Sequence, residues 1–130
     1  MKLLENIKQS YSHLPYTWKH KIAVIKLEKQ FTGKNTLRCY LHDADKLITY
    51  TFLPFLTLHQ HKVLHCKLNK HHHYNDIANL PESVLQEIVL DWESARYTKP
   101  DKPFTAREWC VKKRMNCYPY LAPIFDKWGI

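Results

Sequence analysis

Glycine is almost missing from this chain, which contains only Gly33 and Gly129 among its 130 residues. Tight β-hairpins and phosphate-binding loops depend on glycine, because it adopts the positive φ angles that other residues avoid. Strand-like alternation of β-branched residues is also nearly absent from the sequence. The sequence therefore predicts an all-α protein that folds as one compact domain over residues 1–130, a bundle of about five to seven helices.

Capping residues and prolines place the expected helices. A central helix, covered on more than one face, is expected from Thr17 to Phe31, and Gly33 can end it. The next helix can be capped by Asn35 or Thr36. Three further helices are expected, and their ranges are Phe55 to Leu68, Pro81 to about Tyr97, and Thr105 to about Cys117.

Apolar spacing predicts which side chains these helices bury. In the first helix they are Trp18, Ile22, Val24, Ile25, Leu27 and Phe31. In the second they are Leu37, Leu41, Ala44, Leu47 and Ile48. Pro119 and Pro123 are expected to break up the tail, and the side chains expected to dock on the core are Leu121, Ile124, Phe125 and Trp128.

The charge balance favours an anionic partner. Lys and Arg number 20 against 12 Asp and Glu, which gives a formal net charge of +8. Small phosphorylated molecules and nucleic acid both fit this charge. The basic residues are spread along the whole chain, which is typical of a solvated surface, so nucleic acid is the less favoured partner.

No apolar run approaches the roughly 18 residues that a membrane-spanning helix requires. Charges at Glu5 and Lys8 come too early for the apolar segment of a signal peptide. We therefore expect a soluble, cytoplasmic protein with no membrane partner. The cysteines contain no C-x-x-C pair, and reduced, mostly buried thiols are expected at Cys39, Cys66, Cys110 and Cys117.

Two polar side chains fall on helix faces that should be buried. His20 precedes Val24 by four residues and Leu27 by seven, so it shares their face. Asp91 follows Ile88 by three residues on the buried face of the helix opened by Pro81. Burying an unpaired carboxylate costs several kcal/mol in effective terms. A cation is therefore expected beside Asp91.

The stretch YLHDADKL adds two more polar residues to an otherwise apolar segment. His42 and Asp43 are adjacent, and neighbouring residues on a helix lie about 100° apart, so both can reach one ion through different rotamers. A single metal ion bound by His20, His42, Asp43 and Asp91 would account for all of these burials.

The order of these residues resembles the HD superfamily of metal-dependent phosphohydrolases. His20 comes first, the pair His42 and Asp43 is followed by Lys46, and Asp91 comes last on a separate helix. The stretch LHDADKL…NKHHHYND…LDWESA looks most like a small, uncharacterised HD-like family of bacterial and phage proteins. The resemblance covers about residues 18 to 97. The chain departs from the superfamily's cyclic-dinucleotide phosphodiesterases, because no GYP follows its histidines, and it is shorter than most of the nucleotidases.

The resemblance implies a divalent metal (Mn, Fe, Co, Ni, Zn or Mg) and hydrolysis of a small phosphorylated substrate, with nucleotides as one class. The implied metal ligands are His20, His42, Asp43 and Asp91. His71 and His72 match the positions of extra histidine ligands in two-metal HD proteins, and His65 is a further candidate. The chain would therefore hold one or two ions.

Lys46 and Asp43 are the residues expected to act in catalysis. Lys46 follows His42 by four residues and Asp43 by three, so it can point into the site and bind a substrate phosphate. An ion pair between Lys46 and Asp43 is the alternative interpretation. Asp45 is expected to face away, because positions two apart do not share a helix face.

Two other functions remain open. HD-like proteins with two irons can run oxygenase chemistry, and His65, His71 and His72 supply nitrogen ligands for it. Alternatively the chain is a basic helical module that binds nucleic acid or a protein without turnover. A solvated, basic loop is the alternative interpretation of the histidine run. It stays open for His71 and His72, and it is the favoured interpretation for His59, His61 and His73.

Overall fold

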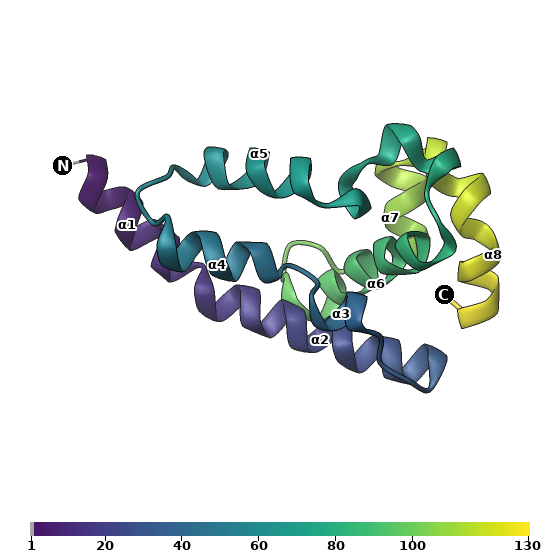
Figure 1. Ribbon diagram of the computed structural model, residues 1–130. Helices are drawn as coiled ribbons and strands as arrows, with labels where there is room; N and C mark the ends of the chain where they lie inside the picture. The colour runs from purple at the N-terminus through teal and green to yellow at the C-terminus, as the bar shows by residue number, and fades with distance from the viewer. Residues whose placement is uncertain (1) are drawn as a thin grey trace.

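The computed structural model describes residues 2–130, and all regular structure in that range is helical, as predicted (Figure 1). The α-helices are α1 (Lys2–Ser12), α2 (Leu14–Thr32), α3 (Leu37–Tyr40), α4 (Ala44–Phe52), α5 (Leu58–Leu68), α6 (Glu82–Thr98), α7 (Ala106–Lys113) and α8 (Tyr118–Trp128). Three 3₁₀ helices join them, namely η1 (Lys70–His72), η2 (Tyr74–Asn79) and η3 (Met115–Cys117). Within this part of the chain, no helix is both long and apolar enough to cross a bilayer.

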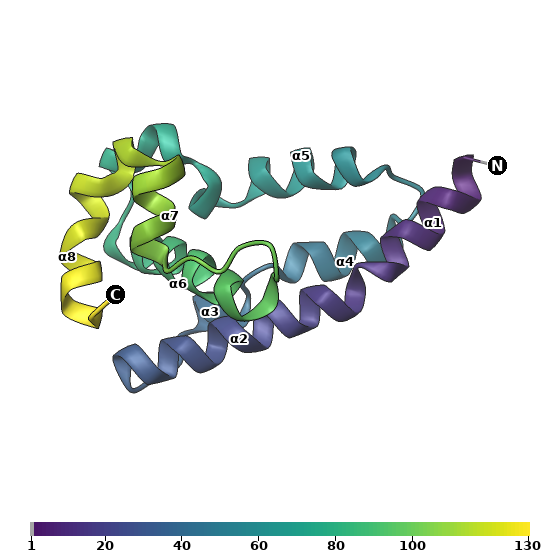
Figure 2. The ribbon, with the colours of Figure 1, turned by 180° about the vertical axis from the view of Figure 1, so that it is seen from behind.

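The helices form an elongated bundle with the two chain ends at opposite poles (Figure 1). The first two helices, α1 and α2, run end to end along one edge, and α4 lies beside them. On the other side of α4 lies α5, while α7 and α8 gather at the C-terminal pole (Figure 2). Between them, α6 packs against α2, α7 and α8.

The central helix is α6 rather than α2. Most of α6 is buried, and its fully covered side chains include Val84, Ile88 and Val89. In α2, by contrast, Trp18 and Ile22 are 52% and 47% exposed. The expectation of an α2 covered on more than one face is therefore wrong, because the face that carries Trp18 and Ile22 is left exposed. The predicted docking of the tail is confirmed, since Leu121, Ile124, Phe125 and Trp128 are buried in α8. The expected break is wrong, because Pro119 lies in the first turn of α8 and the helix continues through Pro123.

Most helix ends follow the predicted chemistry. Gly33 ends α2 with a left-handed φ of 78°. The hydroxyl of Thr36 accepts a hydrogen bond at the start of α3, and Thr105 and Glu108 form the expected capping box of α7. A second capping box, formed by Thr57 and Gln60, starts α5 at Leu58 rather than at Phe55. Capping side chains therefore decide where these helices begin.

The helix expected around residues 37–48 is broken in two. α3 ends at Tyr40, and α4 begins only at Ala44, after a turn that contains His42 and Asp43. Asp43 has φ 57°, the single positive φ of a non-glycine residue in the described part of the chain. The break rotates α3 relative to α4, so the apolar side chains no longer share one face. Leu37, Leu41 and Ile48 are consequently exposed instead of buried.

His61 was expected to be solvated, but it is 2% exposed and joins α5 to α1. The Ser10 hydroxyl donates to the Pro54 carbonyl oxygen at 2.9 Å, so it is free to accept from His61 Nε2–H at 3.1 Å. Burial and the positive charge of His13 lower the pKa of His61. The folded protein therefore favours neutral His61.

This contact predicts a loss of stability in acid. The pKa of His61 is lower in the folded protein than in the unfolded chain. The contribution of His61 to the free energy of unfolding is therefore present above the unfolded-state pKa and is lost as the pH falls below that pKa. Between pH 7.5 and 5, wild type should lose more stability than His61→Gln, as measured by urea unfolding. His59→Gln, an exposed substitution on the same helix, should follow wild type. A difference in unfolding free energy between wild type and His61→Gln that stays constant with pH would contradict this prediction.

Candidate metal centre

Four of the predicted ligands meet in one place between the helices. His20 comes from α2, Asp91 from α6, and His42 and Asp43 from the turn before α4. His20 Nε2 lies 2.8 Å from Asp91 Oδ1, 3.2 Å from His42 Nε2 and 3.6 Å from Asp43 Oδ2. His42 Nε2 lies 3.4 Å from Asp91 Oδ1 and 3.6 Å from Asp43 Oδ1. The predicted convergence of these residues is therefore present in the fold.

These separations suit a shared metal ion. Donor atoms about 2.1 Å from one ion lie about 3.0 to 3.4 Å apart at octahedral or tetrahedral angles. The observed distances among His20, His42, Asp43 and Asp91 range from 2.8 to 3.6 Å. Three of these residues are also almost fully buried, with exposures of 5%, 1% and 2% for His20, His42 and Asp43.

The turn geometry of His42 and Asp43 differs from the expected helix. Asp43 stands immediately before α4 with a left-handed backbone, a conformation that aspartate tolerates better than most residues. This places its two carboxylate oxygens toward different groups. Oδ2 faces His20 and Lys46, while Oδ1 faces His42, His65 and His71. Asp43 therefore stands between two sets of histidines.

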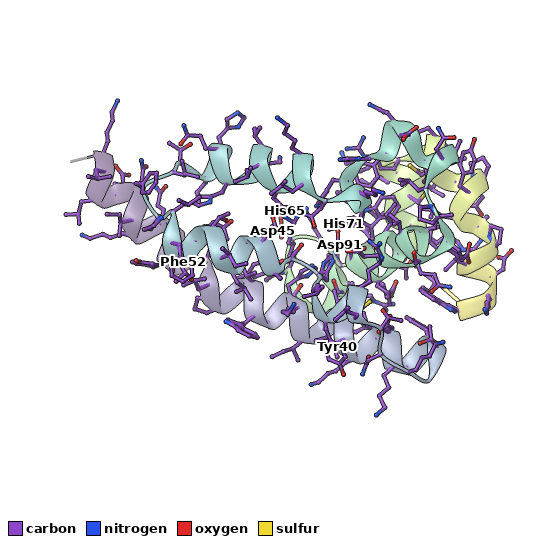
Figure 3. All side chains as sticks on the ribbon, viewed as in Figure 1. Tyr40, Asp45, Phe52, His65, His71 and Asp91 are labelled. Atoms are coloured by element: carbon purple, nitrogen blue, oxygen red, sulfur yellow. The ribbon has the colours of Figure 1, made fainter. Side chains whose placement is uncertain are left out.

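The second set is formed by three histidines. Figure 3 labels His65 of α5 and His71 of η1, and His72 of η1 is the third. His65 Nε2 lies 2.9 Å from His72 Nε2 and 3.2 Å from Asp43 Oδ1. His71 Nε2 lies 3.7 Å from the same carboxylate oxygen. All three histidines offer one nitrogen each within a sphere small enough for an ion. The structure therefore brings together every ligand that the sequence suggested, in two groups that share Asp43.

Two buried atoms of the site have no hydrogen-bond partner within residues 2–130. They are Asp43 Oδ1 and His71 Nε2, and each faces the other group members. A buried polar atom without a partner costs about 1 to 3 kcal/mol. A cation between them would satisfy both, so the residues fit a metal ion. The buried His, Asp and Glu groups can thus hold an ion.

Glu87 of α6 orients the rings of His42 and His71 by contacting their Nδ1 atoms. His42 Nδ1–H and His71 Nδ1–H both donate to Glu87 Oε1 at 3.0 Å, and Arg38 donates to Oε2 at 3.1 Å. The sequence reasoning missed this residue. Its signal was the spacing of Glu87, Asp91 and Ser94, which are four and three residues apart and form a polar stripe on a helix that is otherwise buried.

The other three histidines are held in the same way. His20 Nδ1 lies 3.1 Å from the Ser94 hydroxyl, His65 Nδ1 2.8 Å from Asp45 Oδ2, and His72 Nδ1 3.3 Å from the Tyr74 hydroxyl. In each ring the Nδ1 atom is thus occupied, and Nε2 points to the centre. Outer partners of this kind fix the ring orientation of metal-binding histidines.

Asp45 was expected to face away from the site, and this is wrong. The rule that positions two apart do not share a face applies within a helix, but Asp43 lies outside α4 while Asp45 lies in its first turn. Asp45 therefore reaches His65 on α5. Burial raises its pKa, but the hydrogen bond from His65 and its charge lower it overall.

The site is strongly polarised. Burial lowers the pKa of His42, but the charge of Asp43 and hydrogen bonds to Asp91 and Glu87 raise it to about 10. Burial raises the pKa of Glu87, yet the hydrogen bonds from His42 and His71 hold it at about 2. For His72, burial and the charge of His71 lower the pKa to about 3. The carboxylates are therefore ionised and His72 is neutral, whereas His42 is protonated in the metal-free site and would release its proton on binding a metal ion.

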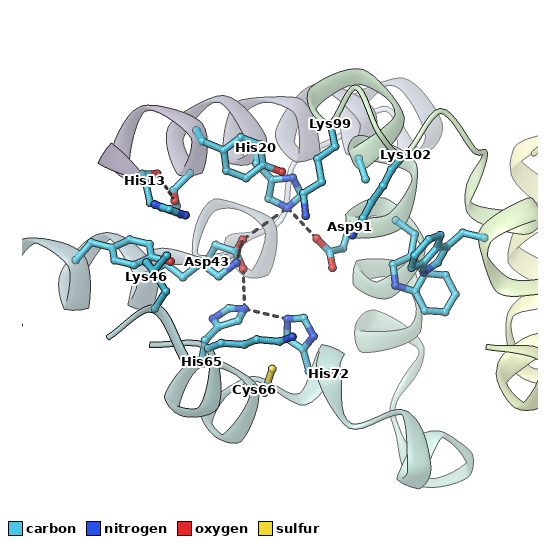
Figure 4. A pocket seen from close by; sticks show the side chains of 18 of the residues that line it. His13, His20, Asp43, Lys46, His65, Cys66, His72, Asp91, Lys99 and Lys102 are labelled. Atoms are coloured by element: carbon cyan, nitrogen blue, oxygen red, sulfur yellow. Dashed lines mark hydrogen bonds and ion pairs between the residues drawn. The ribbon is translucent and has the colours of Figure 1, made fainter. Parts of the chain in front are cut away.

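The centre opens into a cavity of about 840 Å³ (Figure 4). His20, Asp43, His65, His72 and Asp91 line it, whereas His42 and His71 lie behind the wall. Other residues that line the cavity are Tyr16, Lys46, Cys66, Tyr74, Trp92, Lys99, Lys102, Trp109 and Arg114. An ion held by the lining ligands would thus be within reach of a ligand in the cavity.

Lys46 enters this cavity from α4, as predicted. Its Nζ lies 3.4 Å from Asp43 Oδ2, so the ion pair with Asp43 and a position facing the cavity are both present. Burial lowers the pKa of Lys46, but the charges of Asp43 and Asp91 raise it overall. Lys46 therefore carries a positive charge beside the centre.

The cysteines take no part in the centre. Cys39, Cys110 and Cys117 are buried free thiols, and burial raises the pKa of each, for Cys110 to about 12. Cys66 is half-buried and lines the cavity next to His65. The prediction of unpaired, mostly buried thiols is confirmed for the folded chain.

Comparison with known proteins gives no relative for this arrangement. No protein-family model, no curated protein and no solved structure matches the chain. The functional interpretation therefore depends on the geometry of the residues themselves.

Proposed function

We propose that this protein is an HD-type, metal-dependent phosphohydrolase that acts on a small phosphorylated substrate. The observation that carries the proposal is the pair of ligand groups around Asp43, with Lys46 beside them at the floor of an open cavity. A structural metal site would be closed by Cys and His ligands, whereas this set includes the carboxylates of Asp43 and Asp91 and faces a cavity.

The first ion would be held by His20, His42, Asp43 and Asp91. Asp43 Oδ1, His65 and His72 would hold a second, with His71 as a further donor. A divalent ion at such a site acts as a Lewis acid on a phosphoester and lowers the pKa of bound water. The chain itself fixes the ligand rings through their Nδ1 partners and keeps the carboxylates ionised.

The substrate class follows from what surrounds the centre. The Lys46 ammonium suits a phosphate oxygen, because lysine binds phosphate as a point charge. The net charge of +8 favours approach of an anion. The cavity of about 840 Å³ is large enough for a nucleotide-sized molecule. A phosphomonoester of that size is therefore the substrate that the site fits best.

The proposal is tested by metal analysis of the purified protein together with a phosphatase screen. The expected result is one or two equivalents of a divalent metal and release of inorganic phosphate from small phosphomonoesters, with loss of activity on chelation. Protein that binds no divalent metal, or that binds metal and releases no phosphate from any phosphomonoester, would overturn the proposal.

Replacing Lys46 separates phosphate binding from metal binding. Lys46→Gln should lower kcat/KM for a phosphomonoester by about 10- to 100-fold, the scale of one charge-assisted hydrogen bond. Its metal content should equal that of wild type. Lys67→Gln, an exposed substitution on α5, is the control and should change neither quantity. If the metal content falls together with activity, Lys46 instead acts by orienting Asp43.

A di-iron oxygenase is the second candidate, and the second ligand group favours it. His65, His71 and His72 give that group three nitrogen donors, and imidazole suits iron well. Bound iron with oxygen consumption and without phosphate release would support the oxygenase. Phosphate release that persists without oxygen would support the hydrolase.

A further inference from the structure

A tight turn after α6 carries two lysines to the mouth of the cavity. The backbone N–H of Lys102 donates to the Lys99 carbonyl oxygen at 3.1 Å. Pro100 and Asp101 occupy the two central positions, and both residue types favour β-turns. The turn fixes the spacing of Lys99 and Lys102, and both side chains line the cavity beside Asp91 (Figure 4).

Neither lysine forms an ion pair with an acid in the part of the chain that the structure describes. The lysine and arginine ion pairs within residues 2–130 involve Arg38, Lys46, Arg96 and Arg107. The two ammonium groups instead lie over aromatic rings, Lys99 Nζ at 5.6 Å from the centre of Tyr16 and Lys102 Nζ at 5.0 Å from that of Trp109. Contact with a ring face holds an ammonium group in place without using its hydrogen-bond donors on a carboxylate.

The two charges also act on each other. Burial and the positive charge of Lys99 both lower the pKa of Lys102. Both side chains are half-buried, so solvent screens them less than it screens surface lysines. Two adjacent ammonium groups repel each other, and an anion between them relieves this repulsion. The pair is therefore an anion site that the metal ligands do not explain.

The pair lies on a different side of the centre from Lys46. Lys46 comes from α4 and contacts Asp43, whereas Lys99 and Lys102 reach in from the loop after α6, beside Asp91. A phosphate at the centre would already have the metal and Lys46 as partners. We infer that Lys99 and Lys102 bind a second phosphate group of the substrate, one that is not hydrolysed. This inference rests on the proposed function for the first phosphate.

Two matched probes test it: adenosine 5′-monophosphate and adenosine 3′,5′-bisphosphate, at constant ionic strength with Mn²⁺. Wild type should bind the bisphosphate at least about tenfold more tightly in calorimetry, on the scale of an additional charge-assisted contact. The double variant Lys99→Gln and Lys102→Gln should lose this preference, weakening the bisphosphate about 10- to 100-fold and the monophosphate much less. The charge-matched control is Lys112→Gln with Lys113→Gln, both exposed on α7 and outside the cavity lining.

The outcomes separate the two proposals. Equal weakening of both probes in the Lys99 and Lys102 variant would assign the pair to the hydrolysed phosphate and overturn the inference. Absence of a bisphosphate preference in wild type, or an equal effect of the control variant, would overturn it too. Phosphate release is measured in parallel. A preference that depends on the pair supports the second phosphate site even where the phosphatase screen overturns the hydrolase proposal.

Discussion

Asp43→Asn is expected to lower metal content to below half of the wild-type value and to lower phosphoester turnover by about 1,000-fold or more. The reason is its position. Asp43 Oδ2 faces His20, and Oδ1 faces His42, His65 and His71, so one side chain serves both ligand groups. Asparagine keeps the shape but removes the charge, and it turns one of the two oxygens into a hydrogen-bond donor that cannot bind a cation.

Asparagine is also the substitution that disturbs the backbone least. Asp43 has φ 57°, and asparagine occupies the left-handed region more readily than alanine does. Asp43→Ala would therefore combine loss of the ligand with strain in the turn. The measurements are metal content and initial rates, with Asp76→Asn, an exposed acid in η2, as the control. Full metal content and full activity in Asp43→Asn would contradict both the site and its proposed chemistry.

The second large effect is expected from Glu87→Gln, although Glu87 does not face the cavity. We expect its metal affinity to fall about 10- to 100-fold, as is usual when the outer partner of a ligating histidine is removed. Glu87 Oε1 accepts from the Nδ1–H groups of both His42 and His71. A glutamine oxygen lacks the charge, and its amide donates where the carboxylate accepted from Arg38.

Metal affinity is measured by competition with a chelator, and stability by urea unfolding of the metal-free protein. We also expect Glu87→Gln to lose about 1 to 3 kcal/mol in unfolding free energy, because glutamine offers one neutral oxygen where the carboxylate accepts from His42, His71 and Arg38. Glu82→Gln, exposed at the start of the same helix, is the control. Should stability fall while metal affinity stays at the wild-type value, Glu87 would be a structural residue and not an orienting one.

The fold class and the inward-facing positions of His20 and Asp91 could be predicted because each depends on local signals. Scarce glycine and helical periodicity indicate an all-α chain, and His20 and Asp91 lie in long helices whose apolar stripes define the buried face. Those stripes continue uninterrupted past the site residue, so the direction of the side chain follows from spacing alone. His20 and Asp91 are accordingly where the spacing placed them.

The region around His42 could not be predicted in the same way. Spacing assumes a continuous helix, and nothing in YLHDADKL signals that Asp43 will adopt a positive φ. Tertiary contacts favour the break between α3 and α4. Lys21 of α2 donates to the carbonyl oxygens of Tyr40 and His42, which in a continuous helix would accept from backbone N–H groups four residues later. A lysine on the neighbouring helix α2 thus occupies carbonyl groups at the break between α3 and α4. The role of Asp45 depends on the same break, so it was missed for the same reason.

The distribution of the thiols leaves one cysteine, Cys66, as a site for attaching a thiol-reactive probe. Three of its four cysteines are buried with a raised thiol pKa, which makes them slow to react with alkylating reagents. Cys66 is the remaining one, on the cavity wall beside His65. A maleimide fluorophore or a nitroxide would therefore attach selectively at the edge of the centre. Without any engineered residue, it would report the arrival of a paramagnetic ion by quenching or by line broadening.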